Sequence, residues 1–330
     1  MSSAFLLAAA LWLAPPAGTP PPESPDLLRA RAILARVPLI DGHNDLPWKI
    51  REHAPAPHDV AAYDLRGPTP GHTDLPRLRA GKVGAQFWSV YVPGDGPPAD
   101  FLRVQLEQID LARRMVARYP DDLALATTAD ELERAFRGGR IASLLGAEGG
   151  HTIVDDLAVL RAYHALGVRY LTLTHNVHTA WADCAVLPPR HGGLTAFGEE
   201  VVREMNRLGM LVDLSHVAPA TMDDALRVSE APVIFSHSSA RALTDVPRNV
   251  PDDVLRRLPA NGGVVMVTFL QAYVSIAAAD ARAARRRADA ELRRIRDPAE
   301  RRRRQAELDA HPAPRATLAE VADHIEHIRQ

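Results

Sequence analysis

Residues 37–45 read VPLIDGHND, a short apolar run followed at once by polar side chains that can bind a metal. The apolar part has the length of a buried strand, and His43 and Asp45 stand just beyond it. Three further potential ligands follow comparable apolar runs later in the chain: Glu148, His216 and His237. One histidine beside an apolar run is usually a core residue, but this recurrence indicates side chains that converge on a metal. The pattern favours a metallohydrolase.

The composition limits the kinds of partner and metal site. The chain has 330 residues with a formal net charge of −2, and 46% of them are hydrophobic. This charge gives no reason to expect nucleic acid or an acidic membrane surface as a partner. Cys184 is the only cysteine, so an intramolecular disulfide and a cysteine-based zinc site are both excluded. Any metal must be held by histidines and carboxylates.

The N-terminus carries a segment typical of a secretory signal. Residues 4–14 are apolar, too few for a comfortable membrane span, and a Pro-rich stretch follows up to Pro25. We expect a cleavable signal and an exported protein, periplasmic or secreted; the alternatives are an uncleaved anchor, which alone would attach the chain to a membrane, and an ordinary tail. The expected organisation is a signal-like segment and Pro-rich linker at 1–25, and a single barrel domain at 26–330.

Seven strand-like runs recur along the chain. They cover residues 37–41, 83–92, 141–147, 170–174, 210–214, 233–235 and 264–269. Segments with helical spacing alternate with them, such as 155–166, 197–208 and 219–229. This alternation predicts an α/β fold with a parallel sheet, and the number of strands favours a TIM-type (β/α)8 barrel over an open sheet. The eighth strand of such a barrel is missing from the count.

The C-terminal part has a different character. Residues 277–310 are rich in Ala and Arg, with acidic residues interleaved. We expect an exposed helical insertion crossed by salt bridges, with a patch for an anionic partner as the alternative. Residues 317–329 place apolar side chains on one helical face and predict one more helix, of the kind that would precede the last strand.

In a parallel barrel, the residues that follow each strand meet at one mouth. His43 and Asp45 lie two positions apart on an extended backbone, so both can point inward as a ligand pair. Glu148 is a carboxylate able to bridge two metals, with capping of the next helix as the alternative. His216 and His237 supply imidazoles suited to zinc, and a core or capping role is the alternative for either one alone.

Six motifs stand in order along the chain: LIDGHNDLPW at 39–48, EGG at 148–150, LTLTHN at 171–176, DLSH at 213–216, FSHSSA at 235–240 and RNVPDD at 248–253. Together they resemble the membrane dipeptidase (renal dipeptidase) family, peptidase family M19, within the amidohydrolase-like barrels. The resemblance runs from about Pro38 to the C-terminus. Six motifs in one order make it specific, because chance explains one of them but not all.

The resemblance implies a binuclear site that holds two Zn²⁺ ions. His43 and Asp45 would bind one ion, His216 and His237 the other, and Glu148 would bridge both. The ions would share a water, lower its pKa and present it as hydroxide to the scissile carbonyl.

The resemblance also implies roles around the metals. His175 would act with Glu148 in catalysis by polarising the carbonyl and stabilising the oxyanion. Arg248 would bind the terminal carboxylate of the substrate, and Tyr273 would contact the substrate too. The implied reaction is hydrolysis of small dipeptides that have a free C-terminal carboxylate and an L- or D-residue at the second position. A homodimer is the assembly often found in the family.

One departure from the family pattern affects the expected activity. The family carries a Gly-Ser-Asp-like motif on the eighth strand, and its Asp is thought to pass a proton to the leaving amine. No residue here matches it, because Asp323 falls on the predicted helix at 317–329. We therefore expect a C-terminally incomplete barrel whose activity is in doubt. The alternatives are an amidohydrolase-like enzyme for another amide or a lactone, and a truncated, inactive metal-binding homologue.

Overall fold

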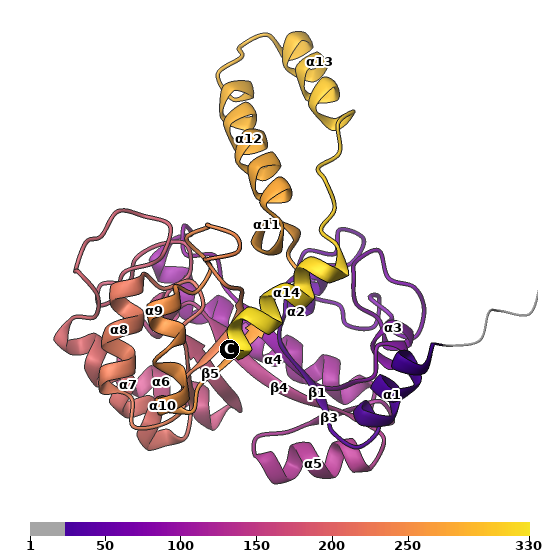
Figure 1. Ribbon diagram of the computed structural model, residues 1–330, viewed down its shortest axis with the longest axis vertical. Coiled ribbons are helices and arrows are strands. Elements are labelled where there is room, and N and C mark those ends of the chain that lie inside the picture. The colour runs from indigo at the N-terminus through magenta and orange to yellow at the C-terminus, as the bar shows by residue number, and fades with distance from the viewer. Residues whose placement is uncertain (1–23) are drawn as a thin grey trace, which may run out of the picture. The chain divides into compact units, whose positions relative to one another are not determined.

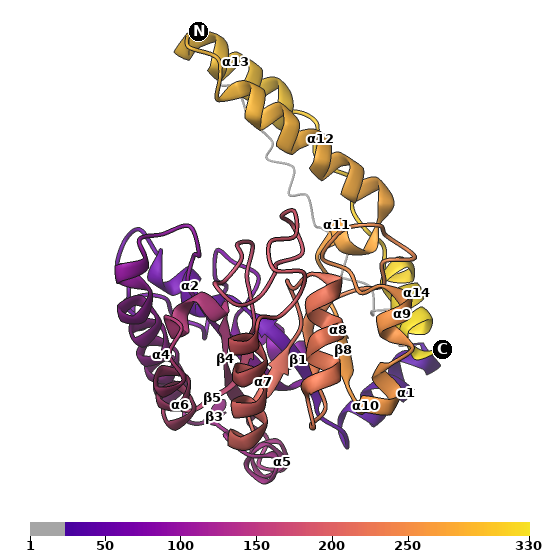
Figure 2. The same cartoon turned by 90° about the vertical axis from the view of Figure 1, so that its left-hand side faces the viewer.

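A computed structural model of the chain describes residues 24–330 (Figures 1 and 2). The signal-like run at 4–14 lies outside these residues. The chain divides into two compact units, residues up to Val37 and residues 38–330. The described part of the first unit contains α1 (Pro25–Leu34), which begins where the Ser24 side chain accepts a hydrogen bond from the Leu27 amide at 3.2 Å.

The second unit is built on a parallel sheet. Its strands are β1 (Leu39–Asn44), β2 (Val83–Tyr91), β3 (Leu123–Leu125), β4 (Ile141–Glu148), β5 (Val168–Thr172), β6 (Leu211–Asp213), β7 (Ile234–Ser238) and β8 (Val264–Val267). Seven of them follow one path in the order β1-β2-β4-β5-β6-β7-β8, and β3 pairs with β4 beside that path. All seven predicted strands are present. The sequence missed β3, because three residues are too short for a periodic pattern.

The sheet curls into a nearly closed barrel. Within residues 24–330, β1 pairs only with β2 and β8 pairs only with β7, so the two ends of the path leave a seam. This confirms a TIM-like α/β barrel without an eighth strand on the path. The predicted first strand was too short, because β1 continues past Asp41 to Asn44 and includes His43.

The helices of this unit lie either against the outside of the sheet or in the loops between its strands. They are α2 (Leu46–Arg51), α3 (Leu75–Ala80), α4 (Phe101–Arg118), α5 (Ala129–Arg137), α6 (Leu157–Ala165), α7 (Ala196–Leu208), α8 (Pro219–Val228), α9 (Asp252–Leu255), α10 (Leu258–Asn261), α11 (Gln271–Val274), α12 (Ile276–Leu292), α13 (Pro298–Asp309) and α14 (Leu318–Arg329). Local sequence sets their ends. Thr195 caps α7 through a hydrogen bond from the Gly198 amide, and Gly209 ends the helix in the left-handed region at φ 72°.

The core lies around the middle of the sheet. Every residue of β4 is buried, since both faces of this central strand are covered. Gly146 of β4 makes room for the ring of Tyr170, because a Cβ at this position would lie 2.0 Å from that ring. This close approach places the phenol of Tyr170 at the mouth of the barrel, next to His43.

The Arg-rich segment forms a helical hairpin made of α12 and α13. Both views show it extending away from the barrel (Figures 1 and 2). Arg285 pairs with Asp289 at 2.9 Å and with Asp309 at 2.8 Å, which joins the two helices. The structure confirms the expected exposed insertion with salt bridges. It also confirms the helix predicted at 317–329, which a capping box of Thr317 and Glu320 begins.

Candidate metal centre and active site

The predicted ligands come together at the C-terminal end of the sheet. His43 lies near the end of β1, Glu148 is the last residue of β4, His216 follows β6, and His237 lies in β7. Because all these strands are parallel, their ends share one mouth. His43, Glu148 and His237 thus belong to strands rather than to the loops that follow, so the strand backbone holds them.

Glu148 occupies the middle of this cluster. Its Oε2 lies 3.5 Å from His43 Nε2, and its Oε1 lies 3.0 Å from His216 Nε2 and 3.4 Å from His237 Nε2. The Nε2 atoms of His216 and His237 are themselves 3.0 Å apart. One buried carboxylate therefore presents one oxygen to each side of the cluster. The alternative role as a helix cap does not apply, since the N-cap of the short helix that follows, Gly150–Ile153, is Gly149, and no side chain caps it.

Asp45 completes the side of the cluster that contains His43. It stands at the N-terminus of α2, but its carboxylate makes no capping hydrogen bond there. Its Oδ1 instead lies 3.2 Å from His43 Nε2. Burial acts to raise the pKa of Asp45, but the positive charge and hydrogen bond of His43 outweigh it and hold the pKa well below its usual range.

The pKa of His43 is shifted in the opposite direction from those of His216 and His237. Burial acts to lower the pKa of His43, yet the negative charges of Glu148 and Asp45 outweigh it and raise the pKa to about 9. Burial lowers the pKa values of His216 and His237 far below the usual value, and Arg248 adds to this effect. These two imidazoles are therefore neutral at pH 7 and offer lone pairs to a metal.

The outer ring nitrogen of each histidine has its own partner. The Nδ1 contacts are Tyr170 Oη for His43 at 3.1 Å, Asn176 Oδ1 for His216 at 3.2 Å, and Ser236 Oγ for His237 at 2.8 Å. All three Nε2 atoms consequently face Glu148. Histidines that bind metals are usually held in this way, through hydrogen bonds on the nitrogen that does not bind. The donor set therefore fits a metal.

A buried carboxylate supports His237 from behind. Asp213 Oδ2 accepts hydrogen bonds from the hydroxyls of Ser236 at 2.7 Å and Thr172 at 2.5 Å. Since the Ser236 hydroxyl donates to Asp213, the Ser236 oxygen must accept a hydrogen bond from Nδ1–H of His237. This fixes the tautomer in which His237 Nε2 carries a lone pair toward Glu148.

His216 has a strained backbone. Its φ is 71°, in the left-handed region that residues other than glycine seldom adopt. Its carbonyl is held by the Ala185 amide at 2.7 Å and by the Thr174 hydroxyl at 3.2 Å. Strain of this kind persists where the surrounding structure imposes it, most often at functional sites.

His175 lies beside the cluster, on the loop that follows β5. Its ring packs against His216 at 4.4 Å and edge-on against Tyr91 at 4.9 Å between centroids. Glu148, His175 and His216 each bring one possible ligand atom within 4.8 Å of the others. Asn176 joins the two histidines, since its Nδ2 lies 3.4 Å from His175 Nε2 and its Oδ1 faces His216.

Arg248 is buried beside His237. Its Nη2 donates to the His237 carbonyl at 3.5 Å, while Nε and Nη1 have no hydrogen-bond partner within the described residues. The guanidinium lies over the Tyr273 ring at 5.5 Å. Burial lowers the pKa of Arg248. A buried guanidinium with open donors is suited to bind a carboxylate.

The structure thus gathers the five predicted residues His43, Asp45, His175, His216 and His237 around Glu148. It places Arg248 at the His237 carbonyl, with Tyr273 against it. Sequence reasoning missed the residues that orient them: Tyr170, Asn176, Asp213 and Ser236. Three of the four lie inside the motifs at 171–176, 213–216 and 235–240. Their position in a motif was a signal, but no role followed from it without the contacts.

Comparison with known proteins places the chain in a family. The family model for membrane dipeptidase, peptidase family M19, matches residues 27–330. A dipeptidase, verJ, of Clonostachys rogersoniana is 49% identical over 257 residues, covering 74% of this chain and 66% of its own length. Dipeptidase 3 of Mus musculus is 50% identical over 246 residues, covering 73% of this chain and 49% of its own length. The chain therefore spans about two thirds and about half of these relatives.

Solved structures support the fold. The probable dipeptidase PvdM of Pseudomonas aeruginosa has a TM-score of 0.74 at 23% identity, over 92% of this chain and 82% of its own. A metallopeptidase of Rhodobacter sphaeroides, bound to a phosphinate mimic of the dipeptide L-Ala-D-Ala, has a TM-score of 0.66 at 28% identity, over 73% and 76%. Among residues 24–330, no helix has the length and apolar character needed to cross a membrane. The site at the end of its strands and the match over residues 27–330 lead to one conclusion: the chain belongs to the membrane dipeptidase family, peptidase family M19.

Proposed function

We propose that the chain is a zinc-dependent dipeptidase. The observation that carries this proposal is the position of Glu148, whose two carboxylate oxygens lie 3.0–3.5 Å from the Nε2 atoms of three histidines. A carboxylate surrounded by imidazoles in this way matches the oxygen and nitrogen ligands that zinc prefers.

The proposed ligands form two sets that share Glu148. His43 and Asp45 would hold one zinc ion and His216 and His237 the second, with Glu148 shared between them. When bound, a pair of zinc ions supplies a water that is acidic enough to attack a carbonyl at neutral pH. Nδ1 partners such as Ser236 keep the rings oriented, so that little rearrangement is needed when the metals bind.

The remaining residues position the substrate. His175 lies next to the cluster, and it donates a hydrogen bond to the oxygen of the scissile carbonyl as negative charge develops there. Arg248 binds the C-terminal carboxylate with its open Nε and Nη1 donors, and Tyr273 packs against the same guanidinium. A longer peptide would place a neutral amide at Arg248, so the substrate is a dipeptide with an L- or D-residue at its second position.

The apolar run at 4–14 supports export of the chain to a periplasmic or extracellular location. A secreted or periplasmic dipeptidase meets small peptides released outside the cytoplasm. Fractionation of cells that express the full chain tests this part of the proposal, and recovery in the cytoplasm alone would contradict it.

The experiment combines metal analysis with hydrolysis of dipeptides. The zinc-loaded chain should contain two zinc ions, and His216→Ala or His237→Ala should each remove or weaken one of them. Arg248→Ala should lower kcat/KM for free dipeptides by about 10²-fold or more, and much less for dipeptides amidated at the C-terminus. Equal losses on both substrates would favour another amide or a lactone as substrate. Two zinc ions without turnover would support an inactive metal-binding homologue.

A further inference from the structure

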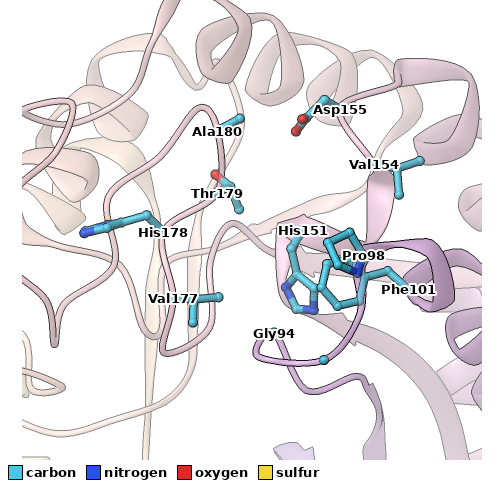
Figure 3. A pocket seen from close by; sticks show the side chains of 11 residues that line it. Gly94, Pro98, Phe101, His151, Val154, Asp155, Val177, His178, Thr179 and Ala180 are labelled. Carbon is cyan, nitrogen blue, oxygen red and sulfur yellow. The ribbon is translucent and has the colours of Figure 1, made fainter.

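A cavity of about 350 Å³ lies between the loops that follow β2, β4 and β5 (Figure 3). Two of the residues that line it stand close to site residues along the chain: His151 is three residues after Glu148, and Val177 is two residues after His175. The cavity therefore shares its loops with two residues of the candidate active site. Its volume is at the lower end of the range for pockets that bind small molecules.

The walls of the cavity are mainly apolar. Pro98, Phe101 and Val177 line it, and Figure 3 shows the ring of His151 between Phe101 and Val177. The rings of Phe101 and His151 meet edge-on at 4.7 Å. Gly94 permits the close approach of Val177, because a Cβ at position 94 would lie 2.4 Å from Val177 Cγ2. An apolar side chain is the natural occupant of such a space.

Among the polar side chains that line the cavity, which include Asp155 and His178, His151 lies against its apolar part, beside Phe101. Its side chain is buried, and within the described residues neither ring nitrogen forms a hydrogen bond of normal geometry. Burial lowers the pKa of His151 to about 4, and the nearby Val92 carbonyl opposes this only in part. The ring is therefore neutral at pH 7. A neutral imidazole with open nitrogens suits a hydroxyl group of a ligand rather than a charge.

The rim of the cavity is strained. Val154 and Asp155 have φ values of 48° and 56°, in the left-handed region. A β-branched residue rarely adopts this conformation. Val154 nevertheless stands there with 41% of its surface exposed, as part of the cavity wall. Strain and an exposed apolar side chain at one position are typical of a binding site.

The arrangement of the strands relates the cavity to Arg248. Arg248 follows β7, which lies far from β2 along the order β1-β2-β4-β5-β6-β7-β8. Because the sheet curls into a barrel, the loops after β2 and β4 lie across the mouth from the loop of Arg248, and the loop after β5 lies between them. A dipeptide with its carboxylate at Arg248 and its carbonyl beside Glu148 and His175 must direct its first residue toward these loops.

We propose that this cavity receives the side chain of the first residue of the substrate. The preferred substrates are dipeptides whose first side chain is large and apolar or phenolic, and His151 contacts the phenolic hydroxyl. This inference rests on the proposed dipeptidase function, and it adds the part of the substrate that sets selectivity.

Binding of phosphinate dipeptide mimics tests the inference without depending on turnover. The full, zinc-loaded chain is titrated calorimetrically with mimics whose first residue corresponds to Gly, Leu, Phe or Tyr. The Phe-like and Tyr-like mimics should bind at least about 10-fold more tightly than the Gly-like mimic, as expected when a pocket buries several more carbon atoms. Ala180→Phe places a ring at the cavity and should abolish this preference, while the affinity for the Gly-like mimic stays within about twofold. Val186→Phe, a similar change on the same loop outside the lining, should leave the preference intact.

The outcomes separate the two proposals. If no mimic binds, the proposed function fails and this inference fails with it. If all mimics bind with one affinity, or if Ala180→Phe weakens every mimic equally, the inference alone is overturned. His151→Leu should weaken the Tyr-like mimic about 10-fold relative to the Phe-like one. An equal effect on both would overturn the contact assigned to His151.

Discussion

At the scale of single residues, the site depends on which nitrogen of each histidine faces Glu148. The answer comes from side chains behind the rings rather than from the rings themselves. The Ser236 hydroxyl donates its hydrogen bond to Asp213, so the Ser236 oxygen accepts a hydrogen bond from Nδ1–H of His237. A short chain of hydrogen bonds therefore fixes the lone pair that a metal needs.

Ser236→Ala removes this chain while leaving every proposed ligand in place. We expect the affinity for zinc to fall about 10–100-fold, because His237 can then rotate or change tautomer. Competition with a chelator, followed at equilibrium, measures this change. Ser143→Ala is the matched control, since Ser143 is equally buried in the same sheet and its hydroxyl contacts only the Ile141 carbonyl at 3.4 Å. Equal zinc retention in both variants would contradict the role given to Ser236.

At the scale of the elements, β4 and β5 set the position of His43 through one close contact. Gly146 lets the Tyr170 ring lie against β4, and the Tyr170 hydroxyl then reaches both His43 Nδ1 at 3.1 Å and the Gly42 carbonyl at 3.2 Å. The packing of two neighbouring strands thus determines the orientation of a proposed ligand on a third.

Gly146→Ala should disturb this contact. The added methyl would lie 2.0 Å from the ring of Tyr170, so the ring or the strand must move. Overpacking of this kind costs about 1–3 kcal/mol in the free energy of unfolding, which denaturant titration measures. Zinc retention should fall as well. Gly67→Ala, where no atom lies within 4 Å of the new methyl, should change neither quantity. An unchanged Gly146→Ala variant would show that the ring is not held by this packing.

A contact between α6 and α7 makes the free energy of unfolding depend on pH. Glu204 of α7 accepts hydrogen bonds from Arg207 at 2.7 Å and from Arg161 of α6 at 3.0 Å. The hydrogen bonds of Arg207, joined by Arg161, lower the pKa of Glu204 to about 2 against the effect of burial. A lowered pKa in the folded state stabilises the fold above the unfolded value of 4.5, and this stabilisation is lost as the pH falls toward 2.

Glu204→Gln should therefore lower the free energy of unfolding by about 1 kcal/mol at pH 7 and by much less near pH 2. Denaturant titrations at a series of pH values between these limits check the expectation. Glu200→Gln, on an exposed position of the same helix, should have no comparable effect. If Glu204→Gln lowers the free energy of unfolding by the same amount at every pH, this account is wrong.

At the scale of the whole barrel, the seam between β1 and β8 is the main weakness. Each of these strands has a partner on one side only within the described residues. Val264 of β8 is 51% exposed, and unpaired strand edges with apolar side chains promote association between molecules. The ligand residues nevertheless meet at the mouth, because they lie on or just after strands of one parallel sheet, and β1, which carries His43, still pairs with β2.

Val264→Lys should slow the aggregation of the chain several-fold without lowering its free energy of unfolding, because a charge at an edge opposes pairing with another edge. Light scattering during gentle heating measures the rate. Val186→Lys, an equivalent change at an exposed loop position, serves as control and should slow aggregation less. Equal effects would mean that net charge, rather than the strand edge, governs association.

Much of the fold could be predicted because its signals are local. Seven apolar runs gave the seven strands of the barrel path, and helical spacing gave α14. The first and last residues of the strands were predicted less accurately. The apolar run at 37–41 predicts a strand that ends at Asp41, because polar residues follow, whereas pairing with β2 extends β1 to Asn44. The three-residue β3 left no periodic pattern at all.

The sequence by itself determined which side chains reach the mouth, because the ends of parallel strands and the family motifs are read from neighbouring residues. Only the tertiary structure decided how those side chains are oriented. The 3.0 Å separation of the His216 and His237 Nε2 atoms, the open donors of Arg248 and the cavity beside His151 all depend on contacts between distant segments. Such contacts follow from packing of the whole barrel, which no local pattern of residues records.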